Sequence, residues 1–258
     1  MTSTAVATDY LALRDVSVYY SIGKENILAL DTVNLEIAKG ETVCVVGPSG
    51  CGKTTILNLV AGFLFPSLGE ISLAGERVDS PDADRAVVFQ QDAVFPWLTV
   101  RKNLEYGPKR RRAFDADARR RVDHYLELMG LEGFADAYPK MLSGGMRKRV
   151  DVARAYVNDP EVILLDEPFG AIDDMTKNHL QRELMRLSVE EPKTSIFITH
   201  DIEEAIYLGD RVVVMTPRPG KVKEVIAVEE ARPRDLAWKT TNEFQEMRRH
   251  IQSSLGEM

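Results

Sequence analysis

The 258-residue sequence has only two cysteines, Cys44 and Cys51, and no apolar run long enough to cross a membrane. Two cysteines cannot build a disulfide framework or a four-cysteine zinc site, so both are expected to be free thiols. The first ten residues carry no positive charge and no apolar stretch, which argues against a secretory signal and predicts a short disordered leader. The sequence also lacks internal repeats and low-complexity linkers. These absences favour an ordinary globular protein of the cytosol.

Basic residues are in the minority: 33 Lys and Arg stand against 40 Asp and Glu, a net charge of −7. A nucleic-acid partner requires a basic surface to pair with its phosphates, so this balance argues against one. The 44% hydrophobic and 28% charged residues are typical of a soluble fold, and the length predicts one or two domains.

Apolar runs separated by Gly, Pro and Asp alternate with segments of helical periodicity. The expected strands are 11–19, 33–37, 42–46, 70–73, 86–89, 162–165, 195–198, 211–215 and 221–228. The expected helices are 52–61, 115–129, 144–157, 174–189, 201–208 and 242–255. Strands that alternate with helices predict an α/β fold with a mainly parallel sheet covered on both faces.

Two segments depart from this alternation. Residues 92–160 contain helix and loop only, which indicates a helical insertion within the α/β core. The segment 242–255 places Phe244, Met247 and Ile251 at helical spacing. We expect that last helix to dock on its own domain, with a partner-binding helix as the alternative.

A glycine-rich loop follows the apolar strand 42–46 and precedes an apolar helix. Its residues match G-x-x-x-x-G-K-[ST]: Gly47, Pro48, Ser49, Gly50, Cys51, Gly52, Lys53, Thr54 and Thr55. Glycines let successive backbone N–H groups approach phosphate oxygens, and the helix adds its positive dipole end. Lys53 is then expected to reach the β- and γ-phosphates of ATP, and the Thr54 hydroxyl to ligate Mg²⁺. The amides and Lys53 would also favour a Cys51 thiolate that MgATP protects from alkylation.

Two acids, Asp166 and Glu167, end the apolar run 162–165. A buried strand holds acids only at its exposed end, facing a site. Asp166 therefore suits Mg²⁺ from behind its direct ligands or through water, and Glu167 suits the base or orienter of an attacking water.

A second glycine-rich helix start follows, and it consists of Leu142, Ser143, Gly144, Gly145 and Met146. A second anion-binding device in one chain is unexpected unless it also serves a nucleotide. A plain P-loop kinase would have no need of it.

Together these motifs resemble the nucleotide-binding subunit of ABC transporters over about Leu11 to Val228, with a C-terminal helical tail at 229–258. The resemblance implies a P-loop NTPase core with an N-terminal antiparallel β region and a helical signature subdomain at about 92–160. It also implies that residues 142–146 contact the ATP of the opposite subunit.

The same resemblance assigns roles to single residues. Tyr20 would stack on adenine, with neighbouring Tyr19 as the alternative. Gln90 would touch Mg²⁺ and the attacking water, with Gln91 as the less favoured choice. His200 would sense the γ-phosphate, and Asp173 would contact the other subunit.

Met146 replaces the glutamine that often ends the signature, and methionine cannot donate a hydrogen bond. Methionine here, with Phe95-Pro96-Trp97 and the segment 216–220, resembles the importer branch for nitrate, sulfonates and taurine. In that family the permease and an external binding protein select the solute, so nitrate, sulfonates, taurine, pyrimidine precursors and riboflavin-like vitamins all stay open.

The resemblance thus implies an ATPase that energises solute import at the cytoplasmic side of the membrane. Its expected partners are a second copy, permease subunits that meet the helical region around residues 92–106 and, indirectly, an extracytoplasmic solute-binding protein. The alternative is an ABC-type ATPase that acts on soluble partners in cluster assembly or translation.

Overall fold

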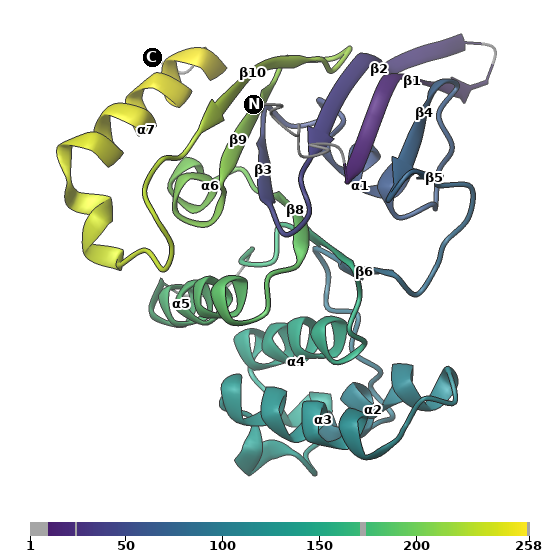
Figure 1. Ribbon diagram of the computed structural model, residues 1–258, viewed down its shortest axis with the longest axis vertical. Helices are drawn as coiled ribbons and strands as arrows, with labels where there is room; N and C mark the ends of the chain where they lie inside the picture. Colours follow the sequence, from purple (N-terminus) through teal and green to yellow (C-terminus); the bar gives the residue numbers. More distant parts are fainter. Residues whose placement is uncertain (1–9, 24, 171–173, 257–258) are drawn as a thin grey trace, which may run out of the picture.

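The computed structural model describes residues 10–23, 25–170 and 174–256, which form two sheets and several layers of helices (Figure 1). The larger sheet has the strand order β10-β9-β3-β8-β7-β6. Its strands are β3 (Thr42–Val46), β6 (Arg85–Val88), β7 (Val162–Asp166), β8 (Thr194–Ile198), β9 (Arg211–Met215) and β10 (Val222–Ala227). All neighbours pair in parallel except β10, which is antiparallel to β9. The predicted mainly parallel sheet is confirmed.

The second sheet is antiparallel, with the order β2-β1-β4-β5. It consists of β1 (Leu11–Ile22), β2 (Glu25–Ile37), β4 (Leu68–Leu73) and β5 (Glu76–Arg77). β2 begins eight residues before the expected strand because residues 25–30 pair with the end of β1 in a hairpin, from Ile22↔Glu25 onward. Residues 27–30 form an apolar run of their own, so the expected strand started too late.

The strands of the parallel sheet are buried on both faces, and successive residues belong to different core clusters. Val43 and Val45 of β3 pack with the antiparallel sheet and helix α1 (Lys53–Val60), whereas Cys44 and Val46 pack with the outer helices. Helix α1 therefore lies between the two sheets (Figure 1). Burial on both faces explains why these strands appear as unbroken apolar runs.

The region between β6 and β7 is helical, as predicted. It contains α2 (Val100–Arg110), α3 (Ala116–Leu128), α4 (Gly144–Val157) and the short 3₁₀ turns η1 (Glu132–Phe134) and η2 (Pro139–Met141). These helices pack on one another at one end of the molecule (Figure 1). Helix α2 was not predicted as a separate helix, since its apolar residues are few. Among the described residues, no helix is long and apolar enough to cross a membrane.

The remaining helices cover the outer face of the parallel sheet: α5 (Asp174–Glu190), α6 (Ile202–Leu208) and α7 (Asn242–Leu255), with η3 (Leu236–Thr240) before α7. Phe244 and Ile251 of α7 are fully buried, so the tail helix docks on its own chain, as expected. The Phe244 ring meets that of Trp238 edge-on at 4.9 Å. Buried Arg234 donates to the carbonyls of Ile206, Tyr207 and Gly209 and so satisfies the end of α6.

Candidate functional site

The P-loop joins β3 to α1 at the carboxyl edge of the parallel sheet, where ligands of such sheets bind. Gly50 and Gly52 have positive φ angles of 76° and 103°. A side chain at Gly52 would lie 2.5 Å from Leu30, so this position needs glycine for its backbone angle and for its space. Lys53 donates to the carbonyls of Gly47 at 2.7 Å and Pro48 at 3.2 Å, which bends its side chain over the loop.

Cys51 points away from the ligand side of the loop. Its side chain is 1% exposed and packs in the core cluster between the sheets, with the sulfur 3.9 Å from Lys53 Nζ. Burial of the sulfur works against alkylation, whereas the Lys53 ammonium beside it favours a thiolate, so a Cys51 thiol that MgATP protects stays a prediction. The backbone of Cys51 serves the loop, while its side chain is a core residue.

A pocket of about 340 Å³ opens over the loop. It is lined by Tyr20, Ala29, Ser49, Gly50, Gly52, Lys53, Thr54, Thr55, Gln90, Glu167 and Arg218. The Tyr20 hydroxyl lies 3.3 Å from Thr55 Oγ1. Tyr19 is absent from this lining because neighbouring strand residues face opposite ways. The geometry favours Tyr20 over Tyr19 as the residue beside the nucleotide.

Asp166 and Glu167 stand at the end of β7. The Thr54 hydroxyl donates to Asp166 Oδ2 at 3.1 Å, and burial raises the pKa of the Asp166 carboxyl while this hydrogen bond opposes the rise. Hydroxyl, amide and carboxylate oxygens are the ligands that Mg²⁺ prefers, so Thr54, Gln90 and Asp166 fit that ion. Glu167 has a φ angle of 44°, a sparsely populated backbone region for a residue other than glycine. Such conformations cluster at functional sites.

Gln90 and His200 approach the same oxygen of Glu167. Gln90 Nε2 donates to Glu167 Oε2 at 2.8 Å, and His200 Nδ1 lies 3.5 Å from that atom. The His200 side chain is 72% exposed, so it faces out of the subunit. Gln91 makes neither contact, and the geometry selects Gln90 of the two.

The signature loop Leu142–Met146 lies elsewhere. Ser143 caps α4, and its hydroxyl accepts from the Met146 N–H at 3.2 Å. Ser143 and Gly144 are exposed, whereas Met146 packs partly on the core. Within the described part of the chain, the residues that line the 340 Å³ pocket include none of this loop. Asp173 falls outside the described residues.

Lys148 was missed by the sequence analysis. It is 2% exposed, and its ammonium donates to the carbonyls of Phe89 at 2.9 Å and Gln90 at 3.0 Å. Burial lowers the pKa of Lys148, with partial compensation from Asp151 and Asp92. Lys148 ties α4 to the segment that carries Gln90. Lys148 follows the basic Arg147, and such a basic run is also typical of a solvated helix face. The sequence therefore gave no signal that Lys148 is buried.

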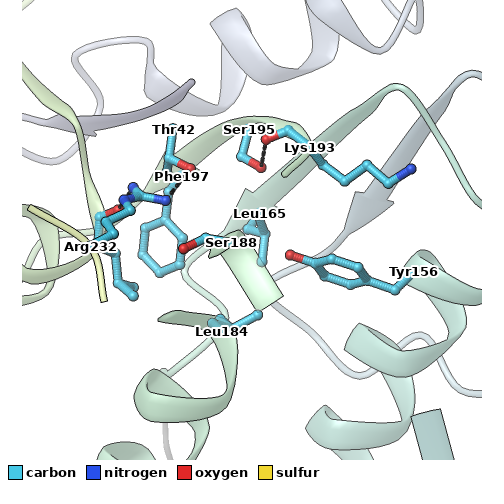
Figure 2. A pocket seen from close by; sticks show the side chains of 10 residues that line it. Thr42, Tyr156, Leu165, Leu184, Ser188, Lys193, Ser195, Phe197 and Arg232 are labelled. Atoms are coloured by element: carbon cyan, nitrogen blue, oxygen red, sulfur yellow. Dashed lines mark hydrogen bonds between the residues drawn. The ribbon is translucent and has the colours of Figure 1, made fainter. Parts of the chain in front are cut away.

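A second, smaller cavity lies between the parallel sheet and the helices that cover its outer face (Figure 2). Thr42 and Ser195, near the starts of β3 and β8, line it with Tyr156, Phe197 and Arg232. Its volume of about 30 Å³ holds a water molecule or two but no nucleotide. The pocket over the P-loop is the candidate nucleotide site, because the phosphate-binding loop and Lys53 line it.

A family profile described as ABC transporter matches residues 30–170, more than half of the chain. The chain belongs to the ABC transporter ATP-binding family. Members of this family are ATPases, and so is this chain. The family match extends over the P-loop, Gln90, the signature loop and both acids at the end of β7.

Relatives and solved structures agree with this assignment. The taurine import ATP-binding protein TauB of Roseobacter denitrificans is 46% identical over 82% of this chain and 80% of its own length. The aliphatic sulfonates import ATP-binding protein SsuB of Bacillus cereus is 42% identical over 93% of this chain and 94% of its own. The ATP-binding cassette MJ0796, solved as a dimer in a post-hydrolysis state with ADP and phosphate, matches with a TM-score of 0.75. It is 34% identical and covers 86% of this chain and 100% of its own.

Proposed function

We propose that this ATPase energises the import of a small solute through a membrane permease, by ATP-driven closure of a head-to-tail dimer. The observation that carries the proposal is the separation of two anion-binding devices on one chain. The P-loop pocket is lined without Leu142–Met146, while Ser143 and Gly144 stand exposed at the start of α4. A second copy, turned head to tail, would bring its signature loop over the phosphates held by the first.

Each residue of one nucleotide site has its own proposed role. The P-loop amides and Lys53 hold the phosphates, and Tyr20 stacks on adenine. Glu167 polarises the attacking water, while Gln90 and His200 hold its carboxylate from two sides. Thr54, Gln90 and Asp166 would hold Mg²⁺, which supplies charge neutralisation to the phosphate oxygens when bound. In MJ0796 the bound products are ADP and phosphate, which matches this chemistry.

Hydrolysis removes the γ-phosphate contacts that join the two copies, so the subunits part. Asp173 is proposed to take part in the contact between them. The movement would reach a permease through the helical region around residues 92–106.

A groove of about 320 Å³ on that region is lined by Phe95, Tyr106 and Arg154, among others. The Phe95 ring packs on Tyr106 at 4.5 Å and on Trp97 at 5.5 Å, yet Trp97 remains 69% exposed. The three rings therefore pack on one another, but the Trp97 ring remains open to solvent. An exposed tryptophan beside an apolar groove is a suitable docking surface for a helix of the permease.

Under this proposal the protein would act at the cytoplasmic face of the membrane, attached through its permease, and the solute-binding protein would act only through that permease. We propose residues 11–228 as the ATPase domain, with the helical subdomain at about 92–160 inserted and 229–258 as a tail.

The test is affinity purification of the tagged Glu167→Gln protein from solubilised membranes of its own cells, with ATP present. We expect an integral-membrane permease in stoichiometric amount, and its loss when Trp97→Ala is added to Glu167→Gln. Trp97→Ala alone should still hydrolyse ATP, which shows that the nucleotide site is intact. Reconstitution of the complex should give ATP-dependent uptake of the solute, with taurine and aliphatic sulfonates as the first candidates. Recovery of soluble partners only would contradict the import proposal.

A further inference from the structure

The loop between β9 and β10 lies against the nucleotide pocket, and strand β2 holds it in place. Gly220 donates its N–H to the Ala29 carbonyl at 2.9 Å and accepts from the Asp31 N–H at 3.0 Å. Lys221 pairs with Asp31 at 2.6 Å. Within the loop, Thr216 Oγ1 accepts from the Lys221 N–H at 3.0 Å. The loop is therefore a fixed extension of β2 and not a free connection.

This loop also touches the P-loop directly. A Cβ atom placed on Gly220 would lie 1.8 Å from the Cys51 carbonyl oxygen. Only glycine allows so close an approach of two backbones. The position of residues 217–219 is therefore tied to the position of the phosphate-binding amides.

Arg218 is at the tip of this loop, between Pro217 and Pro219, and its side chain lines the pocket with Lys53 and Thr55. A Cβ atom placed on Gly50 would lie 3.7 Å from Arg218 Nη2, which puts the guanidinium beside the P-loop backbone. The proline rings restrict the backbone on both sides of Arg218 and so limit where its side chain can go.

The guanidinium is exposed, and no carboxylate of the described residues forms an ion pair with it. Arginine donates two parallel hydrogen bonds to phosphate and keeps its charge at every physiological pH. The P-loop glycines around Gly50 cradle the α- and β-phosphates. The Arg218 guanidinium lies beside this part of the P-loop, so the phosphates bound there are the anions within its reach.

We propose that Arg218 is a nucleotide-binding residue whose guanidinium contacts the α- and β-phosphates of ATP from the β9–β10 loop. It acts in addition to Lys53, and it binds ADP as well as ATP because the γ-phosphate takes no part. The proposal rests on ATP binding at the P-loop and is independent of transport.

The experiment measures displacement of a fluorescent nucleotide from the monomeric protein by ATP, ADP and adenosine, at low salt. Arg218→Met keeps the length of the side chain and removes the charge, and Arg218→Lys keeps the charge. Lys223→Met is the matched control, since Lys223 lies on the same hairpin but bonds to Ser254 of α7.

We expect Arg218→Met to weaken ATP and ADP binding alike by about tenfold, the size of one charge-assisted hydrogen bond to an exposed group. Arg218→Lys should recover part of the loss, while adenosine affinity and the Lys223→Met protein stay within twofold of the parent.

Three results would overturn the proposal. ATP affinity unchanged in Arg218→Met would show that the guanidinium makes no nucleotide contact. An equal loss for adenosine would mean that Arg218 supports the base and not the phosphates. Normal binding to the monomer, with loss of ATP-dependent dimerisation alone in a Glu167→Gln background, would assign Arg218 to the second copy.

Discussion

The side-chain amide of Gln90 donates a 2.8 Å hydrogen bond to the carboxylate of Glu167, and strand register explains why the two meet. Val88 of β6 pairs with Leu165 of β7, so Gln90 and Glu167, each two residues after this pair, face one another. Asp166 in turn pairs with Ile198 of β8, two residues before His200. Three parallel strands thus deliver three site residues to one point.

Glu167→Gln should abolish turnover while leaving ATP binding intact. Glutamine keeps the shape but cannot accept a proton, and a general base contributes about 10²–10⁴-fold to the rate. The variant should form a stable dimer with ATP on size-exclusion chromatography, because the γ-phosphate is retained. Glu229→Gln, an exposed acid after β10, is the control. Hydrolysis at the parental rate in Glu167→Gln would refute the assigned role.

His200→Ala should lower kcat by about tenfold to a hundredfold, the cost of a misplaced catalytic group. The imidazole lies 3.5 Å from Glu167 and is too exposed to matter for folding. Steady-state ATPase assays measure the fall in kcat, and thermal unfolding checks that the variant is as stable as the parent. His250→Ala, which removes an exposed imidazole that bonds to Glu224, is the control. An unchanged kcat would remove His200 from the site.

Lys148→Met should disturb Gln90 without touching the nucleotide. The change leaves the carbonyls of Phe89 and Gln90 without their charged donor, which costs about 1–3 kcal/mol of folding stability. We expect kcat to fall more than KM rises, and Lys148→Gln, which can still donate, to recover part of the rate. A fall in activity that only follows the folded fraction would show Lys148 to be structural alone.

Gly220→Ala should displace the P-loop, although Gly220 itself lies in the neighbouring β9–β10 loop. Its methyl group would overlap the Cys51 carbonyl, so the loop must shift, at a cost of about 1–3 kcal/mol or more. Denaturant unfolding should show this loss together with weaker ATP binding. Gly133→Ala is the matched control, because a Cβ there meets no atom within 4 Å. Equal behaviour of the two variants would contradict the close approach of the loops.

Phe244→Ala should destabilise the protein by about 3–5 kcal/mol, since the ring is fully buried against Trp238. The exposed Glu246→Ala on the same helix should stay within about 0.5 kcal/mol of the parent. Urea unfolding measures both. If Phe244→Ala were as stable as the control, helix α7 would not be a docked part of the core.

The sequence by itself determined the devices whose chemistry is local. A phosphate loop needs its glycines, its lysine and its hydroxyl close together in the sequence, and Asp166 and Glu167 directly follow an apolar strand. Each motif can therefore be recognised from one short segment. The layered α/β fold could also be predicted from the sequence, because strands buried on both faces are apolar throughout.

Only the tertiary structure decided what depends on two distant segments. It turned the Cys51 thiol into the core between the sheets, away from the phosphates that its backbone faces. It brought Lys148 of α4 under the carbonyl of Gln90, and it set Arg218 beside Gly50. Burial, register and the closeness of two backbones are properties of pairs of segments, and a pattern read along one chain cannot contain them.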